Sequence, residues 1–230
     1  MSTVLLVRHG LTPLTGHVLA GQAPGVHLDE RGQAQATAVG ERIAVLQLYA
    51  VVSSPLERCV ETAKAIVAAQ RGSPEQHIDE RLTECGYGDW TGRPIKELVR
   101  DPVWRLVQTQ PSAAQFPAGE RLTEISARAV AAVRDWDARI GAGAVWVACT
   151  HGDVIKAILA DALGLHLDQF QRIAVDPGSV SVVRYTSTRP YVLRVNDTGA
   201  ELASFAPRPK RRRASGTHPT VGGSSGRGAI

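Results

Sequence analysis

The chain has 230 residues, of which 43% are hydrophobic and 21% charged, a composition typical of globular proteins that excludes disorder along the whole chain. No apolar run approaches the roughly 20 residues that span a bilayer, and the N-terminal apolar stretch ends at Arg8, so we expect a soluble, cytoplasmic protein with no membrane partner. The net charge of +4 arises after Pro207, where six basic and no acidic residues leave about −2 on residues 1–206, which argues against a specific nucleic-acid partner.

In the first half of the chain, short apolar runs alternate with helical patterns, which is typical of a layered α/β domain. The continuously apolar run at 4–7 predicts a strand that is buried on both faces. Further elements are expected in this order: a helix over 29–46, a strand at 49–53, a helix from Pro55 at its first position to about residue 70, and a short strand at 76–78.

The second half of the chain continues the alternation after an irregular stretch. We expect short helices at 95–99 and 103–109, a long helix over 121–140, a buried strand at 145–149, a helix over 154–163, and an edge hairpin of strands 179–185 and 191–196. Residues 1–206 are predicted to form one domain, and the basic, Pro/Gly/Ser-rich residues 207–230 a disordered tail.

Polar residues follow three of the predicted strands, where ligands bind in open α/β sheets. They are Arg8-His9-Gly10, Ser53-Ser54-Pro55 with Arg58 in the helix behind it, and Thr150-His151-Gly152. Guanidinium groups, helix N-termini and imidazoles together suit a phosphate group. A single such residue is more often structural, so the prediction depends on the convergence of all three strand ends.

Other ligand classes fit the sequence less well. Asp153 is the only carboxylate next to the two histidines, and two arginines would repel a cation, so we expect no metal. The chain has neither a GxSxG turn nor a Gly-rich nucleotide loop, so we expect no serine triad and no cofactor. The three cysteines form no CxxC pair and are interpreted as reduced packing residues, although all three lie near the site residues: Cys59, Cys85 and Cys149.

Five segments, in order, resemble the motifs of the histidine phosphatase superfamily, the phosphoglycerate mutase-like enzymes. They are VRHGLT at 7–12, LDERGQA at 28–34, SSPLERCVETA at 53–63, RLTECGYGDWTG at 81–92 and THG at 150–152. The resemblance covers residues 3 to about 196. It implies a three-layer α/β/α sandwich with a mostly parallel sheet, and it leaves a homodimer open.

The resemblance also implies roles for individual residues. His9 would be the nucleophile that becomes phosphohistidine, while Arg8, Arg58 and His151 would hold the phosphoryl oxygens. Glu84 would act as general acid and then as general base, which requires a raised pKa. Further substrate-binding positions are expected at Thr15, Gly21, Gln22, Tyr87 and Gly152.

The sequence departs from the family pattern at a few positions. Leu11 stands where the family often has Glu or Gln, Thr15 where it has Asn, and Gln22 where mutases carry an aromatic residue. We expect residues 93–120 to line the substrate pocket, with Trp104, Arg105, Phe116 and Arg121 as candidates, although a core position is equally expected for the aromatic residues.

The sequence thus predicts a metal-independent phosphatase that hydrolyses a small phosphorylated metabolite through phosphohistidine. A phosphomutase of the phosphoglycerate mutase type is the alternative, and the short segment between Glu84 and His151 favours the phosphatase. A non-catalytic module that binds a phosphorylated ligand is the third interpretation. The presence of His9, Arg58, Glu84 and His151 argues against it.

Overall fold

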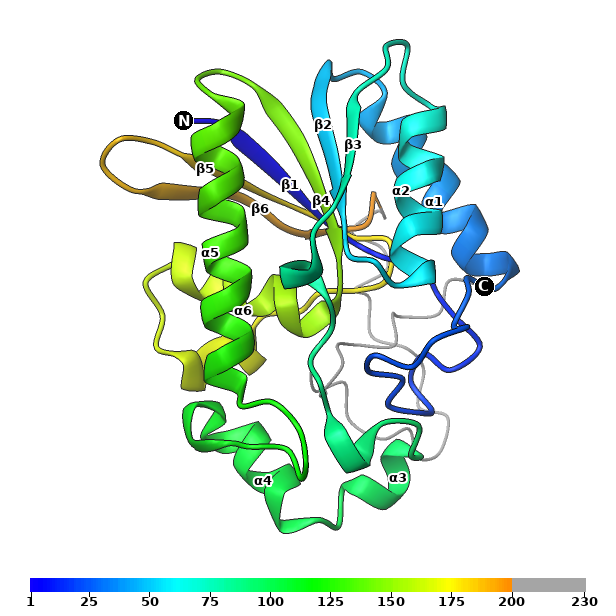
Figure 1. Ribbon diagram of the computed structural model, residues 1–230, viewed down its shortest axis with the longest axis vertical. Helices are drawn as coiled ribbons and strands as arrows, with labels where there is room; N and C mark the ends of the chain where they lie inside the picture. Colours follow the sequence, from blue (N-terminus) through cyan, green and yellow to red (C-terminus); the bar gives the residue numbers. More distant parts are fainter. Residues whose placement is uncertain (200–230) are drawn as a thin grey trace, which may run out of the picture.

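The computed structural model describes residues 1–199, which form an α/β fold around a six-stranded sheet (Figure 1). The expected tail and the boundary at residue 206 lie outside the described residues. The strands are β1 (Thr3–Arg8), β2 (Leu48–Ser53), β3 (Glu75–Ile78), β4 (Val145–Thr150), β5 (Val180–Tyr185) and β6 (Pro190–Asp197). Their order in the sheet is β3-β2-β4-β1-β5-β6.

The sheet is mixed but mostly parallel. Strands β1 to β4 run parallel to one another, β5 pairs with β1 in the antiparallel direction, and β6 pairs antiparallel with β5. The expected hairpin at one edge is therefore confirmed. Because β1 and β4 are neighbours in register, with Arg8 opposite Thr150, their carboxyl ends lie side by side.

Helices cover both faces of the sheet, as a three-layer sandwich requires (Figure 1). They are α1 (Glu30–Ile43), α2 (Glu57–Ala68), α3 (Ile95–Leu98), α4 (Pro102–Thr109), α5 (Leu122–Ile140) and α6 (Gly152–Ala162). Helices α1 and α2 pack on one face and α5 and α6 on the other, while the short α3 and α4 lie beyond the carboxyl ends of the parallel strands. No helix within residues 1–199 has both the length and the apolar character that crossing a bilayer demands.

The pleat of β1 shows why the apolar run near the N-terminus has no polar interruption. Val4 and Leu6 pack into the core shared with α5 and α6, whereas Leu5 and Val7 pack into the core shared with α1 and α2. All four side chains are at most 4% exposed. A strand covered on both faces is apolar at every position, as the sequence predicts.

Three element boundaries differ from those predicted. Helix α1 ends at Ile43, because the chain turns there and leaves Val45 86% exposed, although the apolar spacing continues. Helix α2 begins at Glu57, because Leu56 is extended and Pro55 lies before the helix. Helix α6 begins at Gly152, two residues before its apolar run.

Short 3₁₀ helices fill the irregular segments. They lie at Glu80–Leu82, Gly88–Trp90, Pro111–Ala113 and Leu167–Arg172. None of the four was predicted, because such short helices have no long apolar period. The first two lie on either side of Glu84 and therefore shape the loop that carries it.

Candidate active site

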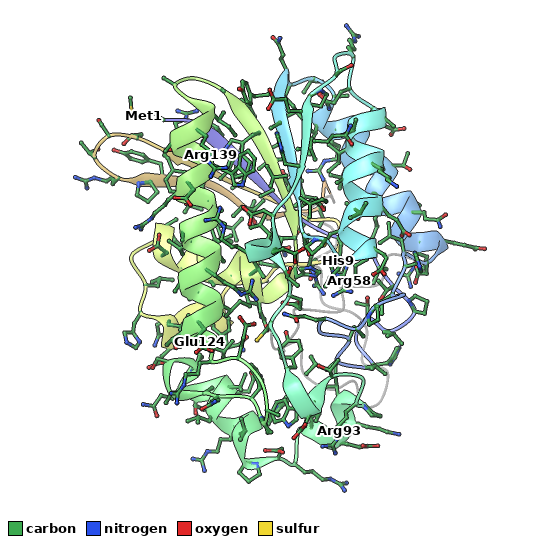
Figure 2. All side chains as sticks on the ribbon, in the orientation of Figure 1. Met1, His9, Arg58, Arg93, Glu124 and Arg139 are labelled. Atoms are coloured by element: carbon green, nitrogen blue, oxygen red, sulfur yellow. The ribbon has the colours of Figure 1, made fainter. Side chains whose placement is uncertain are left out.

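The polar residues of three strand ends come together at one edge of the sheet. Arg8 is the last residue of β1 and His9 follows it, Ser54 follows β2, and His151 follows β4. Figure 2 shows His9 and Arg58 at this edge, far from Met1 at the other end of the sheet. The convergence predicted from the sequence is thus present in the structure.

A close crossing of two backbones fixes the turn after His9. A Cβ atom on Gly10 would lie 2.4 Å from the carbonyl oxygen of Gly32 in the first turn of α1. The Asp29 side chain caps the same turn by accepting from the Gly32 amide at 2.7 Å. Only a residue without a side chain fits at position 10, so the turn and His9 are held against α1.

Hydrogen bonds at both ring nitrogens orient the imidazole of His9. Nδ1 lies 2.7 Å from the Gly10 carbonyl oxygen, which can only accept, so Nδ1 carries the proton. Nε2 therefore has a lone pair, and it accepts from Nε of Arg58 at 3.3 Å. Burial, together with the charges of Arg58 and Arg8, holds the pKa of His9 well below its ordinary value. The ring is therefore neutral at physiological pH, and its Nε2 can act as a nucleophile.

Two buried guanidinium groups face His9. Arg58 donates from Nη2 to the Gly21 carbonyl oxygen at 2.7 Å, and its buried Nη1 has no acceptor among the described residues. Arg8 donates from Nη1 to the Val175 carbonyl oxygen at 2.7 Å. Both side chains are only 2% exposed, so two guanidinium charges are largely removed from water at the pocket, an arrangement that suits an anionic ligand.

His151 contacts both His9 and Arg58. Its ring centroid is 5.2 Å from that of His9, and its Nδ1 accepts from Nη2 of Arg58 at 3.3 Å. Nε2 is 2.8 Å from Oγ of Ser54 and carries the remaining proton. Burial and the charge of Arg58 hold the pKa of His151 well below its ordinary value. His151 does not line the pocket but supports the residues that do.

Glu84 is the carboxyl group of the site. It is 4% exposed, and its Oε1 accepts from the Cys85 amide at 2.9 Å, which leaves Oε2 to hold a proton. Burial and the nearby charge of Asp153 raise the pKa of Glu84 to about 7. Asp153 in turn accepts from the Tyr87 hydroxyl at 2.8 Å and lies 3.3 Å from the buried Lys156 ammonium group. Glu84 can thus give and take a proton near neutral pH.

The loop that carries Glu84 is held by side chains from elsewhere in the chain. Arg128 of α5 donates to the carbonyl oxygens of Arg81 and Thr83, each at 2.7 Å, and to that of Glu84 at 3.1 Å. Gln22 also donates to the Glu84 carbonyl oxygen, at 2.7 Å. We refer to these contacts as the Arg128 clamp.

Glu120 completes the clamp. Its Oε1 accepts from Nε of Arg128 at 2.8 Å, and its Oε2 accepts from the Gly86 amide at 2.7 Å. The backbone amide of Glu120 also donates to the Gly86 carbonyl oxygen at 2.8 Å. The segment on the far side of Glu84 is therefore fixed to the residues before α5.

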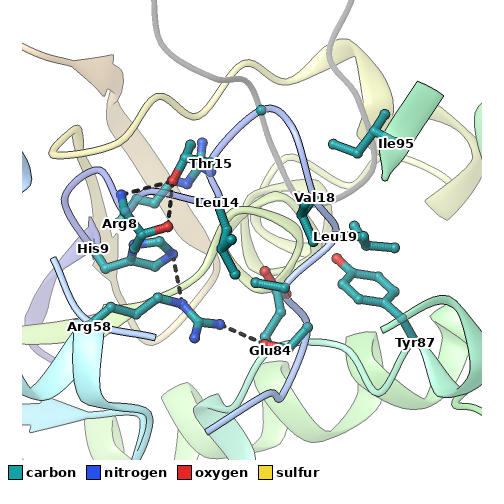
Figure 3. Close-up of a pocket in the computed structure, with 14 residues that line it drawn as sticks. Arg8, His9, Leu14, Thr15, Val18, Leu19, Arg58, Glu84, Tyr87 and Ile95 are labelled. Atoms are coloured by element: carbon teal, nitrogen blue, oxygen red, sulfur yellow. Dashed lines mark hydrogen bonds between the residues drawn. The ribbon is translucent and has the colours of Figure 1, made fainter. Parts of the chain in front are cut away.

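Most of the predicted site residues line one pocket (Figure 3). The predicted residues in its lining are Arg8, His9, Thr15, Gly21, Arg58, Glu84 and Tyr87. Gln22, Gly152 and His151 do not line it: Gln22 holds the Glu84 loop, and Gly152 begins α6. The hydroxyl of Thr15 is 3.0 Å from that of Thr12, and it also accepts from the Thr12 amide at 3.0 Å.

The expectation that residues 93–120 form the pocket wall is largely wrong. Phe116 is fully buried against Tyr87 and Trp90, Trp104 packs beside Trp90, and Arg105 and Arg121 are exposed away from the pocket. Ile95 alone in that range lines the pocket. The wall instead comes from the segment after β1, mainly Leu14, Gly16, Val18, Leu19 and Ala20.

Several residues that shape the site were not found from the sequence. Asp153 and Lys156 are a pair of charges within the otherwise apolar segment 152–160 of α6, before the exposed pair of Asp161 with Arg134, and this pattern could have revealed them. Arg128 and Glu120 have no such signal, because their positions look like the solvated face of a helix and a turn. Their contacts depend on tertiary structure alone.

Other predicted features concern metals and cysteines. Within residues 1–199, no group of three or more His, Cys, Asp or Glu side chains is arranged to hold a metal ion. The cysteines Cys59, Cys85 and Cys149 are all buried and free. Cys149 donates to the Cys59 carbonyl oxygen at 3.3 Å, which is a packing contact of the kind expected from the sequence.

The pocket therefore combines a neutral imidazole with an unprotonated nitrogen, two buried cations and a carboxyl group whose pKa is raised to about 7. Such a set can accept a phosphoryl group on nitrogen, stabilise its charge and protonate a leaving oxygen.

Comparisons with known proteins agree with this chemistry. The family model for the histidine phosphatase superfamily (branch 1) matches residues 4–198. Phosphoserine phosphatase 1 of Hydrogenobacter thermophilus is 27% identical over 86% of this chain and 93% of its own length. A probable phosphoglycerate mutase of Yersinia pestis is 32% identical, over 80% of this chain and 86% of its own length.

Solved structures show the same relationship. YhfR of Bacillus stearothermophilus superposes with a TM-score of 0.79 at 27% identity, covering 86% of this chain and 98% of that one. The mycobacterial glucosyl-3-phosphoglycerate phosphatase gives a TM-score of 0.76 at 25% identity, covering 85% and 98%. The chain belongs to branch 1 of the histidine phosphatase superfamily.

Proposed function

We propose that the protein hydrolyses phosphomonoesters of small metabolites through a phosphohistidine at His9. The observation that carries this proposal is the position of His9 Nε2, which lies 3.3 Å from Nε of Arg58 in the pocket that also contains Glu84. The named relatives include phosphatases of small phosphorylated compounds, which supports the same reaction class.

In the first step, His9 Nε2 attacks phosphorus and the bond from phosphorus to the alcohol oxygen breaks. Arg8 and Arg58 stabilise the negative charge on the phosphoryl oxygens. Both guanidinium groups line the pocket and are shielded from bulk water, which strengthens their attraction for an anion. Glu84, protonated in part at neutral pH, gives its proton to the leaving oxygen. The Gly10 carbonyl oxygen accepts from Nδ1 and stabilises the positive charge that the ring gains.

In the second step, water attacks phosphorus and the bond to His9 breaks. Glu84 is then a carboxylate and takes a proton from the attacking water. Inorganic phosphate leaves, and His9 is neutral again. The raised pKa of Glu84 suits both directions of proton transfer, because the two protonation states are close in free energy at neutral pH.

A mutase must hold a second anionic group of its substrate while it transfers the first. Among the described residues, the cationic side chains that line the pocket are Arg8 and Arg58, and both face the phosphoryl position. Hydrolysis is therefore the better supported of the two reactions.

The nucleophile is tested with His9→Ala. Phosphate release from p-nitrophenyl phosphate and from alkyl phosphates should be lost, because the variant has no atom that can take the phosphoryl group. Brief mixing of the native enzyme with ³²P-labelled substrate should give an acid-labile, base-stable label on His9. The control is His27→Ala, whose exposed ring pairs with Glu61 outside the pocket and should leave turnover unchanged. Native turnover in His9→Ala would overturn the proposal.

A further inference from the structure

The pocket has two halves of different chemistry (Figure 3). The polar half consists of Arg8, His9, Thr12, Thr15 and Arg58. The other half, here called the apolar half, consists of Leu14, Val18, Leu19, Ala20, Ile95 and the ring of Tyr87. Glu84 lies between the two halves in the close-up.

The position of Glu84 indicates where the ester must lie. If His9 receives the phosphoryl group and Glu84 protonates the leaving oxygen, that oxygen is at the boundary of the two halves. The carbon atoms attached to it then extend away from Arg8 and Arg58, into the apolar half.

The apolar half offers no charge to a substrate. Its side chains are aliphatic except for Tyr87, whose hydroxyl donates to Asp153 at 2.8 Å. The acidic group that lines the pocket beside it is Glu84, and Asp153, which accepts from the Tyr87 hydroxyl, is already paired with Lys156. A carboxylate placed there would lose its water without gaining a cation from the pocket lining.

The backbone of this half is also occupied. Leu19 donates to the Arg93 carbonyl oxygen at 3.0 Å and accepts from the Gly92 amide at 2.8 Å. The Ile95 amide donates to the His17 carbonyl oxygen at 2.9 Å, and Val18 forms a bridge with Pro94. These bonds hold Val18, Leu19 and Ile95 together as a preformed wall, and the amides of all three, Val18 through the Leu14 carbonyl oxygen, are bonded within the chain.

We infer that the alcohol part of the substrate is uncharged and apolar in the carbon atoms next to the ester oxygen. The inference rests on the proposed function and narrows it. Phosphomonoesters whose alcohol carries a carboxylate or a second phosphate near that oxygen are poor substrates, because nothing in the apolar half replaces the water they lose.

The test compares esters that share one carbon skeleton. Propyl phosphate and 3-(phosphonooxy)propanoate differ only in a terminal methyl or carboxylate group, and kcat/KM for propyl phosphate should be higher by about tenfold or more. Along ethyl, propyl and butyl phosphate, kcat/KM should rise about threefold to fourfold per methylene, since each buried CH₂ contributes about 0.8 kcal/mol. Equal or faster hydrolysis of the acid would overturn the inference.

A charge in the wall gives an independent measurement. Ile95→Lys places an ammonium group in the apolar half and should shift the ratio of kcat/KM toward the carboxylate ester by about tenfold. Ile95→Leu should keep the native ratio. Val99→Lys is the matched control, because Val99 follows the same short helix, is 50% exposed and does not line the pocket. A ratio that is unchanged in Ile95→Lys would place the alcohol elsewhere.

The failure of this inference is distinguishable from failure of the proposed function. If the native protein releases phosphate from neither p-nitrophenyl phosphate nor any alkyl phosphate, the proposed function is wrong. If it hydrolyses these esters but prefers the carboxylate ester, only the inference about the alcohol is wrong.

Discussion

The two chemical groups of the pocket are positioned in different ways. His9 and Arg8 extend directly from β1, a central strand that is paired on both sides and buried on both faces. Glu84 lies on a loop between two short 3₁₀ helices and has no ladder bonds to fix it. The Arg128 clamp fixes the backbone at Glu84, as the strand pairing of the sheet fixes the backbone before His9.

His9 and Glu84 should therefore differ in how strongly distant substitutions displace them. The proposed nucleophile, His9, follows a strand that is fixed by many backbone hydrogen bonds, so no single distant side chain decides its position. The acid is fixed by a few side chains, so substitutions remote from the substrate should move it. The predictions below separate the two groups by the leaving group of the substrate, because only a poor leaving group needs the acid.

The largest effect is expected for Glu84→Gln. The variant keeps the shape and the acceptor for the Cys85 amide but has no proton to give. Hydrolysis of alkyl phosphates should slow by about 100-fold or more, and that of p-nitrophenyl phosphate much less. The measurement is kcat/KM for both substrates. Equal losses on both would assign the acid role to another residue.

The pH dependence of kcat/KM should also differ between substrates with poor and good leaving groups. Glu84 loses its proton as the pH rises through about 7, so kcat/KM for propyl phosphate should fall about tenfold per pH unit above that value. The pKa of His9 is well below its ordinary value, so the nucleophile stays neutral throughout this range. With p-nitrophenyl phosphate the alkaline limb should be weak or absent. An identical limb with both substrates would contradict the assignment.

Stability provides the control for this titration. The folded state raises the pKa of Glu84, so its contribution to stability is full below the ordinary value of 4.5 and is lost as the pH rises through about 7. Glu84→Gln has no group that ionises at this position, so the variant does not lose stability there as the pH rises. Above pH 7 the variant should therefore melt at a higher temperature than the native protein, by roughly 4 °C or more.

A smaller, indirect effect is expected for Arg128→Met. The substitution keeps the apolar stem of the side chain but removes the donors that hold the carbonyl oxygens of Thr83 and Glu84. Alkyl phosphate hydrolysis should fall by about tenfold, while p-nitrophenyl phosphate hydrolysis falls less. Arg134→Met is the matched control, since Arg134 lies on the same helix in an exposed pair with Asp161. A uniform loss on both substrates would indicate general destabilisation instead.

The same contrast explains how much could be predicted from the sequence. Arg8 ends a buried strand, and His9 and His151 directly follow buried strands, so a pattern of a few consecutive residues was enough to bring them together. Glu84 was found only through its resemblance to a family motif. The Arg128 clamp and the wall at Leu14 and Val18 were not predicted, because their roles depend on contacts between distant segments. Ile95 was predicted only as part of the broad range 93–120.

The smallest effect is expected for removal of the C-terminal residues after Pro207. The basic run of residues 210–213 follows in sequence the segment 1–206, which we expect to form one domain and whose own net charge is about −2. The removed residues supply none of the catalytic groups proposed above. Their composition is too polar to bury much surface, so the melting temperature and kcat should stay nearly unchanged.

If the run attracts phosphorylated substrates, its loss should raise KM only at low salt. Charge interactions are screened over about 8 Å at physiological ionic strength, so the effect should vanish there. The measurement is KM and kcat at low and high salt, together with the melting temperature of both forms. A truncated protein that unfolds, or that loses kcat at high salt, would show that these residues pack on the domain and that it extends beyond residue 206.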